Sequence, residues 1–343
     1  MVKPTRPAVD VERTISFEDN SLLSSVFGNF DQNLALMEHR LGVEISARGN
    51  HVSIRGGEGA CDVTEAALVE IYNRIAAGES MSAGDIEGVI RMKDGQPSGF
   101  AKKHPTKGVG PKIGKGSSNS VRIVTRRRTI SPRSKTQQDY IECLGRADLV
   151  FALGPAGTGK TYLAVVHAVS LLEQGKVDRI ILSRPAVEAG ESLGFLPGDM
   201  REKVDPYVRP LYDALYDVMP MDRVERDIEA GVIEIAPLAF MRGRTLSNAA
   251  IILDEAQNCT SMQMRMFLTR LGENSRMVIT GDPSQTDLPS SVSKGLAEAA
   301  NLLTNVESVE QITFTEADVV RHDLVARIVH AYGELDRKNQ KHN

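Results

Sequence analysis

A glycine-rich segment in the second half of the chain has the composition and spacing of a phosphate-binding loop. Residues 154–161 follow the pattern Gly-x-x-x-x-Gly-Lys-Thr, in which glycines let consecutive backbone N–H groups turn towards phosphate oxygens. Lys160 would supply positive charge to the β- and γ-phosphates of a nucleotide, and the Thr161 hydroxyl is a ligand for Mg²⁺. The predicted nucleotide-binding residues of the loop are Gly154, Pro155, Ala156, Gly157, Thr158, Gly159, Lys160 and Thr161.

Two further polar groups follow apolar runs later in the chain. We expect Asp254 to hold Mg²⁺ together with Thr161, and the adjacent Glu255 to orient and deprotonate an attacking water. Gln285, after the next apolar run, is suited to sensing the γ-phosphate and its water. Because ligands bind at the carboxyl ends of strands in open α/β sheets, these side chains are predicted to meet the loop at one edge of a sheet.

Three apolar runs and one helix must position these groups. Residues 149–153, 250–253 and 277–279 are apolar, as expected for strands buried on both faces of a parallel sheet. Residues 162–174 form a predicted helix whose amino terminus adds a favourable dipole for a bound anion. The order strand, loop, helix is the context that the motif requires. It predicts an α/β fold of the P-loop NTPase (RecA-like) class, with helices flanking a parallel sheet.

A strongly basic segment separates the two halves of the chain. Residues 101–135 hold 11 Lys and Arg and no acid, whereas residues 1–100 carry a net charge of −6 and residues 136–343 one of −9. Its glycines and prolines are typical of a linker, but the charge excess favours contact with a polyanion that weakens steeply with salt. A solvated linker is the alternative. The nucleic-acid candidates here are Arg126, Arg127 and Arg128, in a tract that could form a basic strand or ribbon.

The first hundred residues predict a small α+β domain. Expected elements are a strand at 13–17, helices at 21–27 and 34–41, a hairpin over 43–54, and helices at 66–75 and 82–92. The order resembles a type I KH domain, an RNA-binding module whose turn reads Gly-x-x-Gly. Here the turn is Gly28-Asn29-Phe30-Asp31, and the carboxylate of Asp31 should repel a phosphate. RNA binding and a docking or oligomerisation role are therefore both open for this domain.

Composition and cysteine usage narrow the class of protein. Apolar residues make up 41% and charged residues 25%, which is ordinary globular usage, and no apolar run approaches the roughly 20 residues of a membrane-spanning helix. The amino terminus lacks the apolar core of a secretory signal. Cys61, Cys143 and Cys259 are too scattered for a disulfide framework or a zinc site, so we expect a cytoplasmic protein without membrane contact.

Motifs outside the glycine-rich loop indicate which class of P-loop protein the chain resembles. No Asn-Lys-x-Asp motif and no Leu-Ser-Gly-Gly-Gln signature occurs, which argues against a GTPase and against a transporter ATPase. Asp-Glu-Ala-Gln at 254–257 and Gly-Asp-Pro-Ser-Gln at 281–285 resemble the motor core of superfamily 1 helicases. Together with residues 183–198 and 318–322, they make the chain resemble the PhoH-like ATPase family over about residues 10–335.

This resemblance implies ATP and Mg²⁺ as cofactors, and roles for particular residues. Gln137 resembles a glutamine that recognises adenine, with Gln138 as the rival assignment. Arg321 resembles an arginine finger, and Arg184 lies where helicase-like cores approach nucleic acid. The family resemblance also implies helicase-like roles on RNA and association with a YbeY-type endoribonuclease in ribosomal RNA processing.

The predicted domain organisation bears on the mechanism. It comprises a KH-like domain at 10–80, an accessory helix at 81–100, the basic linker at 101–135, an ATPase core at 136–335 and a polar tail at 336–343. One core cannot provide both motor domains that a superfamily 1 helicase closes around ATP.

Two arrangements could make up for the missing second core. We favour a homo-oligomer, such as a ring, in which Arg321 reaches a neighbour's nucleotide; an ATP-driven switch without unwinding is the other. The functions that follow are a Mg²⁺-dependent ATPase that remodels or unwinds RNA, stimulated by single strands, or an ATP-gated adaptor that docks an endoribonuclease or ribosomal partner.

Overall fold

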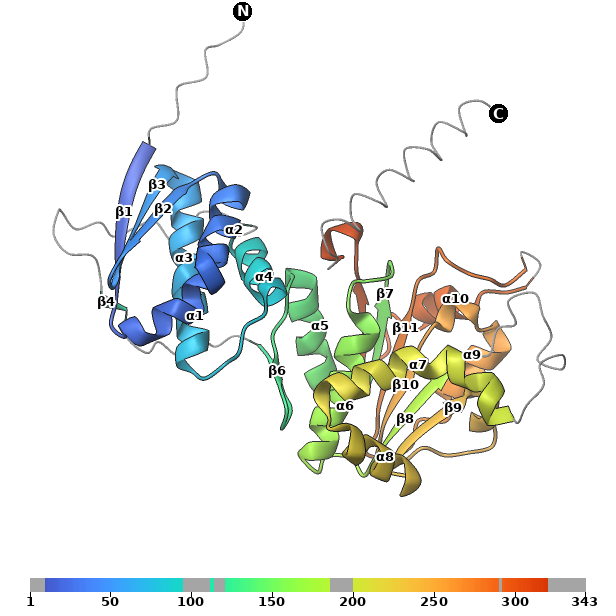
Figure 1. Ribbon diagram of the computed structural model, residues 1–343. Helices are drawn as coiled ribbons and strands as arrows, with labels where there is room; N and C mark the ends of the chain where they lie inside the picture. The colour runs from blue at the N-terminus through green and yellow to red at the C-terminus, as the bar shows by residue number, and fades with distance from the viewer. Residues whose placement is uncertain (1–9, 95–111, 114–120, 186–199, 290–291, 320–343) are drawn as a thin grey trace, which may run out of the picture. The chain divides into compact units, whose positions relative to one another are not determined.

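The computed structural model describes residues 10–94, 112–113, 121–185, 200–289 and 292–319 (Figure 1). The chain divides into two compact units. The first runs to Val121 and includes Ser131–Lys135, and the second comprises Arg122–Ile130 and the chain from Thr136 onward. Within the described residues, no helix is both long enough and apolar enough to cross a membrane.

The first unit is a sheet covered by helices. Its elements are β1 (Asp10–Phe17), α1 (Leu23–Phe27), α2 (Gln32–Leu41), β2 (Glu44–Arg48), β3 (His51–Gly57), α3 (Glu58–Ala76), α4 (Ala83–Asp94) and β4 (Lys112–Ile113). The strand order is β2-β3-β1-β4, with β3 antiparallel to both of its neighbours. The predicted order of strands and helices, including the hairpin of β2 and β3, is confirmed.

Alternation along the strands builds the core of this unit. Ile15 and Phe17 of β1 and Val52 and Ile54 of β3 are fully buried in one cluster. Residues two apart point to the same face of a strand, so both pairs face the same side. Leu68 of α3 belongs to the same cluster, because α3 contacts both β1 and β3. The strand pattern therefore determines which face of the sheet the long helix covers.

The turn between α1 and α2 has an unusual backbone. Phe30 and Asp31 both adopt the left-handed conformation, with φ of 52° and 57°, which costs about 1–2 kcal/mol for a residue with a side chain. The side chain of Asn33 is buried and donates a hydrogen bond to the Val26 carbonyl at 3.0 Å. The Phe30 side chain is fully exposed. The predicted turn thus presents an aromatic ring and a carboxylate to solvent.

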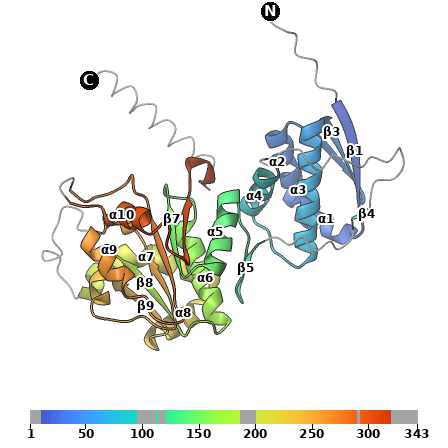
Figure 2. The same cartoon turned by 180° about the vertical axis from the view of Figure 1, so that it is seen from behind.

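The second unit is a parallel sheet with helices on both faces (Figures 1 and 2). Six strands take the order β12-β7-β11-β10-β8-β9, and every neighbouring pair is parallel. The elements are β5 (Ile123–Val124), β6 (Thr129–Ile130), α5 (Lys135–Arg146), β7 (Leu149–Leu153), α6 (Lys160–Glu173), β8 (Arg179–Arg184), α7 (Met200–Val218), α8 (Met221–Glu229), β9 (Ile233–Pro237), β10 (Ala249–Leu253), α9 (Ser261–Leu268), β11 (Arg276–Gly281), α10 (Gly295–Leu302) and β12 (Val309–Thr313).

The central strands are buried on both sides, as their apolar runs predict. Every residue of β7 and of β10 is buried. Helix α6 contacts β8, β10 and β11, while Phe267 of α9 and Leu296 of α10 pack in a cluster with β7, β10 and β11. The predicted α/β class is confirmed, and β7, β10 and β11, the strands that precede the predicted site residues, lie side by side.

Candidate nucleotide-binding site

The glycine-rich loop connects β7 to α6 in the predicted strand–loop–helix order. Gly154, Gly157 and Gly159 all have positive φ, of 132°, 81° and 84°, a region that glycine enters without steric cost. At Gly154 a side chain is also excluded, because an added Cβ would lie 2.3 Å from the carbonyl oxygen of Phe314. The loop can therefore take this curve only with glycine at that position.

Lys160 directs its ammonium group into the loop. Its Nζ donates to the carbonyl oxygens of Gly154 and Pro155, each at 2.7 Å, and lies 3.3 Å from Thr158 Oγ1. Burial lowers the pKa of Lys160, and the carboxylates of Asp282, Asp254 and Glu255 oppose this effect. A positive charge at the amino terminus of helix α6 is well suited to binding a phosphate.

Thr161 and Asp254 bring together the oxygen atoms that Mg²⁺ prefers. Thr161 Oγ1 donates to Asp254 Oδ1 at 2.6 Å, and Thr280 Oγ1 donates to the same oxygen at 2.7 Å. One oxygen of the nearby Asp282, Oδ2, is buried and has no hydrogen-bond partner among the described residues, which suits a water held by a cation or phosphate. Because Mg²⁺ usually keeps several waters and few protein ligands, these residues fit the ion.

Glu255 is held in place by its backbone and by both of its carboxylate oxygens. Its backbone is left-handed, with φ of 52°. Glu255 Oε1 accepts from Arg184 Nη2 at 2.6 Å, and Oε2 accepts from Gln257 Nε2 at 2.5 Å. Gln257 in turn accepts from the backbone N–H of Asp282 at 3.1 Å. Glu255 is therefore oriented through the ends of β8 and β11, the two strands that flank β10.

A cavity of about 270 Å³ joins the predicted groups at the carboxyl edge of the sheet. It brings the loop together with Asp254, Glu255 and Gln285, as the motif positions predict. Four of its residues, Tyr162, Gln257, Gly281 and Asp282, have no role predicted from sequence, although the last three lie inside the quoted motifs. The lining residues are Ala156, Gly157, Gly159, Lys160, Thr161, Tyr162, Asp254, Glu255, Gln257, Gly281, Asp282 and Gln285.

Gln137 supports the loop from behind. Its side chain is buried, and its Nε2 donates to the Thr158 carbonyl at 3.0 Å. Tyr140, one turn later on α5, donates its hydroxyl to the Lys160 carbonyl at 3.2 Å. Gln138 bonds to Glu142 on its own helix, so Gln137, of the two candidates, is the glutamine that contacts the loop. Adenine recognition by Gln137 stays a prediction.

The basic ribbon is confirmed as the hairpin of β5 and β6, but its arginines make contacts within the unit. Arg127 donates to the carbonyls of Tyr216 and Met219 at the end of α7. Arg128 pairs with both oxygens of Asp217, at 2.7 and 2.8 Å. Asp217 also accepts from the hydroxyl of Tyr162, beside the loop, at 2.5 Å.

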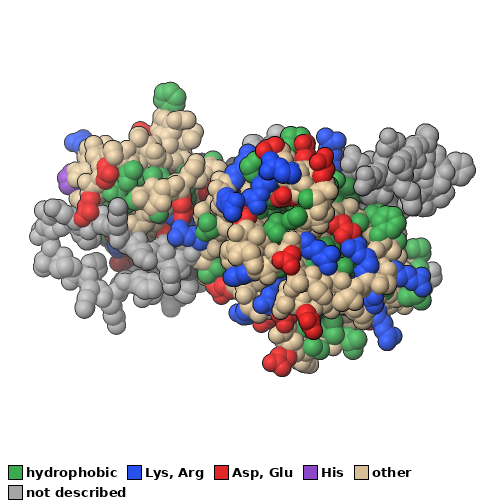
Figure 3. Space-filling model, turned by 90° about the horizontal axis from the view of Figure 1, so that it is seen from below, with side chains coloured by type: hydrophobic (Ala, Val, Ile, Leu, Met, Phe, Trp, Pro, Cys, Tyr) green, Lys and Arg blue, Asp and Glu red, His purple; other side chains and the backbone are tan. Residues whose placement is uncertain are grey.

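Nucleic-acid binding by these arginines stays a prediction. Arg126 bonds through its backbone N–H to Glu173. The face in Figure 3 carries both basic and acidic side chains rather than charge of one sign. Arg321 and residues 186–199 lie outside the described residues, and so do most residues of the predicted linker.

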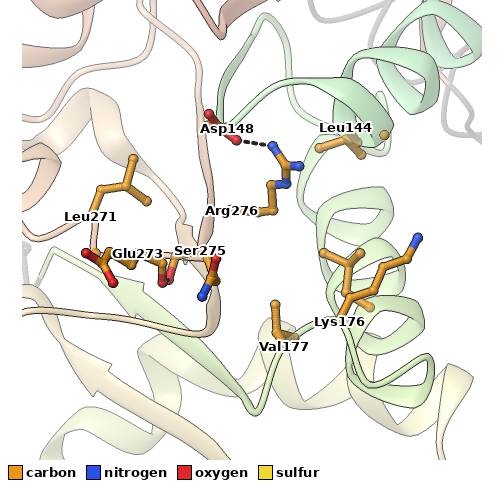
Figure 4. Close-up of a pocket in the computed structure, with 12 residues that line it drawn as sticks. Leu144, Asp148, Lys176, Val177, Leu271, Glu273, Ser275 and Arg276 are labelled. Atoms are coloured by element: carbon orange, nitrogen blue, oxygen red, sulfur yellow. Dashed lines mark hydrogen bonds and ion pairs between the residues drawn. The ribbon is translucent and has the colours of Figure 1, made fainter.

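A second cavity, of about 620 Å³, lies at the opposite edge of the sheet (Figure 4). Asp148, which precedes β7, and Arg276, which begins β11, form an ion pair on its wall. Ligands of parallel sheets bind at the carboxyl ends of the strands, whereas this cavity is bounded by strand beginnings. The smaller cavity at the loop is therefore the candidate site.

Comparison with known proteins agrees with this geometry. The family model described as "PhoH-like protein" matches residues 129–333. The chain is 49% identical to the "PhoH-like protein" of Bacillus subtilis strain 168 over 316 residues, covering 92% of this chain and 94% of that protein. Identity to the "PhoH-like protein" of Mycobacterium tuberculosis H37Rv is 42% over 321 residues, with 92% and 86% covered. "Protein PhoH" of Escherichia coli K12 is 46% identical over 205 residues, 59% and 58% of the two chains. The chain belongs to the PhoH-like protein family.

Proposed function

We propose that the chain binds ATP with Mg²⁺ and hydrolyses it, and that it couples this reaction to the remodelling of RNA. One observation carries the proposal. A single cavity at the carboxyl edge of the parallel sheet is lined by Lys160, by the hydrogen-bonded pair Thr161 and Asp254, and by Glu255. This is the set of groups that phosphoryl transfer to water requires: phosphate donors, a metal site and a group that orients water.

The loop and Lys160 would bind the phosphates. Gly159, Lys160 and Thr161, at the start of α6, line the cavity, so phosphate oxygens could replace the backbone carbonyls as acceptors of Lys160. Thr161 and Asp254 would hold Mg²⁺. A bound Mg²⁺ would neutralise the charge that develops on the phosphates. Electrostatic stabilisation of this kind commonly contributes about 100-fold or more to the rate.

Glu255 and Gln285 would act on the attacking water. Both residues line the cavity, and Glu255 is the carboxylate next to the metal-binding Asp254. Glu255 would accept the proton of the water, while Gln285 would donate to or accept from the water beside the γ-phosphate. The backbone N–H of Gln285 donates to the Asp282 carbonyl at 3.0 Å, which supports the turn that carries its side chain to the cavity.

Coupling to RNA rests on features outside the cavity. The basic segment at 101–135 carries a charge of +11, and the first unit has the strand and helix order of a KH-like domain. Family resemblance further suggests a YbeY-type endoribonuclease as partner. The presence of one ATPase core favours a homo-oligomer, and the composition and cysteine usage favour a cytoplasmic location. The second candidate, an ATP-gated adaptor, is favoured by the turn at Phe30 and Asp31, where an exposed ring and a carboxylate suit a protein partner better than a phosphate.

Steady-state ATP hydrolysis with and without single-stranded RNA, over a series of salt concentrations, tests the proposal. We expect hydrolysis that needs Mg²⁺, is lowered by about 100-fold or more in Lys160→Ala and Glu255→Gln, and is stimulated by RNA with a steep decline in salt. Hydrolysis that both substitutions abolish but RNA does not change would leave the ATPase and favour the adaptor. Hydrolysis unaffected by either substitution would contradict the assignment of the site.

A further inference from the structure

Arg184 lies against the two carboxylates of the site. It is the last residue of β8, which pairs with β10, and the backbone N–H of Asp254 donates to the carbonyl of Ser183 at 2.9 Å. From this position Arg184 Nη2 reaches Glu255 Oε1 at 2.6 Å, and Arg184 Nε lies 3.7 Å from Asp254 Oδ2. The sheet ladder therefore holds the guanidinium between both carboxylates, with its side chain only 17% exposed.

The side chain of Asp254 is buried, with 7% exposed, whereas that of Glu255 is 39% exposed. A buried carboxylate beside a second negative charge is stabilised by a positive charge next to it. The other oxygen of Asp254 accepts from the hydroxyls of Thr161 and Thr280. The other oxygen of Glu255 accepts from the amide of Gln257. These partners are neutral, and Lys160 donates instead to the carbonyls of its own loop. Among the residues that the structure describes, Arg184 is the cation that bonds to this pair directly.

We propose that Arg184 is a built-in counter-ion that occupies Asp254 and Glu255 while the site is without nucleotide, and that it gives way when Mg²⁺ and nucleotide bind. The inference rests on the proposed function, because it concerns the same metal site. Arg184 would act as a positioning residue: it holds the base Glu255 in place and keeps one of its oxygens occupied.

Competition between cations is the physical basis. A divalent ion held by Thr161 and Asp254 would share the Asp254 carboxylate with the guanidinium of Arg184, and two positive groups beside one buried carboxylate repel each other. The contact of Arg184 with Asp254, at 3.7 Å, is longer than a hydrogen bond, so it is weaker than the contact with Glu255. Release of Arg184 from Glu255 would free Oε1 to accept a hydrogen bond from water.

Metal affinity of the nucleotide-free protein tests this role without any hydrolysis. We would titrate the wild-type chain, Arg184→Gln and Arg179→Gln with MnCl₂ and measure free Mn²⁺ by electron paramagnetic resonance. Removing the competing guanidinium should tighten Mn²⁺ binding by roughly fivefold to tenfold. Arg179 begins the same strand, bonds to the Ser247 carbonyl at 3.3 Å, and removes the same unit of charge when replaced, so Arg179→Gln should bind Mn²⁺ as the wild type does.

Thermal unfolding provides a second readout. It distinguishes the proposed counter-ion from an arginine with a purely structural role. Without its counter-ion, Arg184→Gln should unfold at a lower temperature in EDTA, and MgCl₂ should raise its unfolding temperature more than that of the wild type. Arg184→Lys, which keeps the charge, should have an unfolding temperature in EDTA between those of the wild type and Arg184→Gln. Unchanged or weaker Mn²⁺ binding, or a loss of stability that Mg²⁺ does not restore, would overturn the inference. Because neither measurement needs turnover, failure here is distinguishable from failure of the ATPase proposal.

Discussion

Replacing Gly154 with alanine should destabilise the second unit more than its single methyl group suggests. Gly154 has φ of 132°, a conformation that costs about 1–3 kcal/mol for residues with a side chain. The new Cβ would also lie 2.3 Å from the carbonyl oxygen of Phe314. That strand end cannot move freely, because the Phe314 N–H donates to the Leu153 carbonyl at 2.7 Å.

The two costs add because they have different origins. Forced displacement of packed backbone typically costs a further 1–3 kcal/mol or so, so we expect a total of about 3 kcal/mol or more. For a unit of roughly 200 residues, such a loss lowers the unfolding temperature by about 6–12 °C. The curve of the phosphate loop changes as well, so nucleotide affinity should fall together with stability.

Differential scanning calorimetry of the full chain is the assay, since two compact units can give separate transitions. Gly145→Ala is the matched control. Gly145 lies in helix α5, and nothing within 4 Å would meet its new Cβ, so alanine there should stabilise by about 0.5–1 kcal/mol. The reasoning is refuted if Gly154→Ala unfolds within 2 °C or so of the wild type, or if both substitutions shift the transition equally.

Two further predictions concern buried titratable groups. Burial, with help from the charges of Arg276 and Lys176, lowers the pKa of His167 to about 4, against the opposing effect of a hydrogen bond to the Leu144 backbone. The unfolded chain binds this proton more tightly, so the free energy of unfolding should fall by up to about 3 kcal/mol as pH drops from about 6.5 towards 4. Urea unfolding of the wild type and of His167→Gln at pH 7 and pH 5 measures this loss. An equal loss of stability in the two proteins would contradict the prediction. Burial also raises the pKa of the free thiols, that of Cys259 to about 12, so Ellman's reagent at pH 8 should label the native protein only after denaturant is added, and rapid native labelling would disprove that.

Several contacts could not be predicted from sequence because they join residues far apart in the chain. Arg184 and Glu255 are separated by 71 positions and meet only because β8 pairs with β10. Arg128, a nucleic-acid candidate from its sequence, also pairs with Asp217, 89 positions away, and that contact has no sequence signal. A basic side chain looks the same in sequence whether it faces solvent or a helix end, and packing alone distinguishes the two.

Local chemistry could be predicted because its determinants are neighbours in the chain. The phosphate loop needs consecutive N–H groups and glycines at set positions, and residues 154–161 contain both. Strands buried on both faces need continuous apolar runs, and β7 and β10 coincide with such runs almost to the residue. The α/β class, the loop and the two carboxylates therefore follow from sequence alone.

Tertiary structure decided how these pieces meet. Insertion of β11 between β7 and β10 brings Asp282 beside Gln257 at the cavity, and the pairing of β8 with β10 brings a guanidinium to Asp254 and Glu255. Strand order depends on how helices cover both faces of the sheet, which is a property of the whole unit rather than of any segment. The sequence by itself determined which groups could do the chemistry, and the packing of the sheet determined which cation accompanies them.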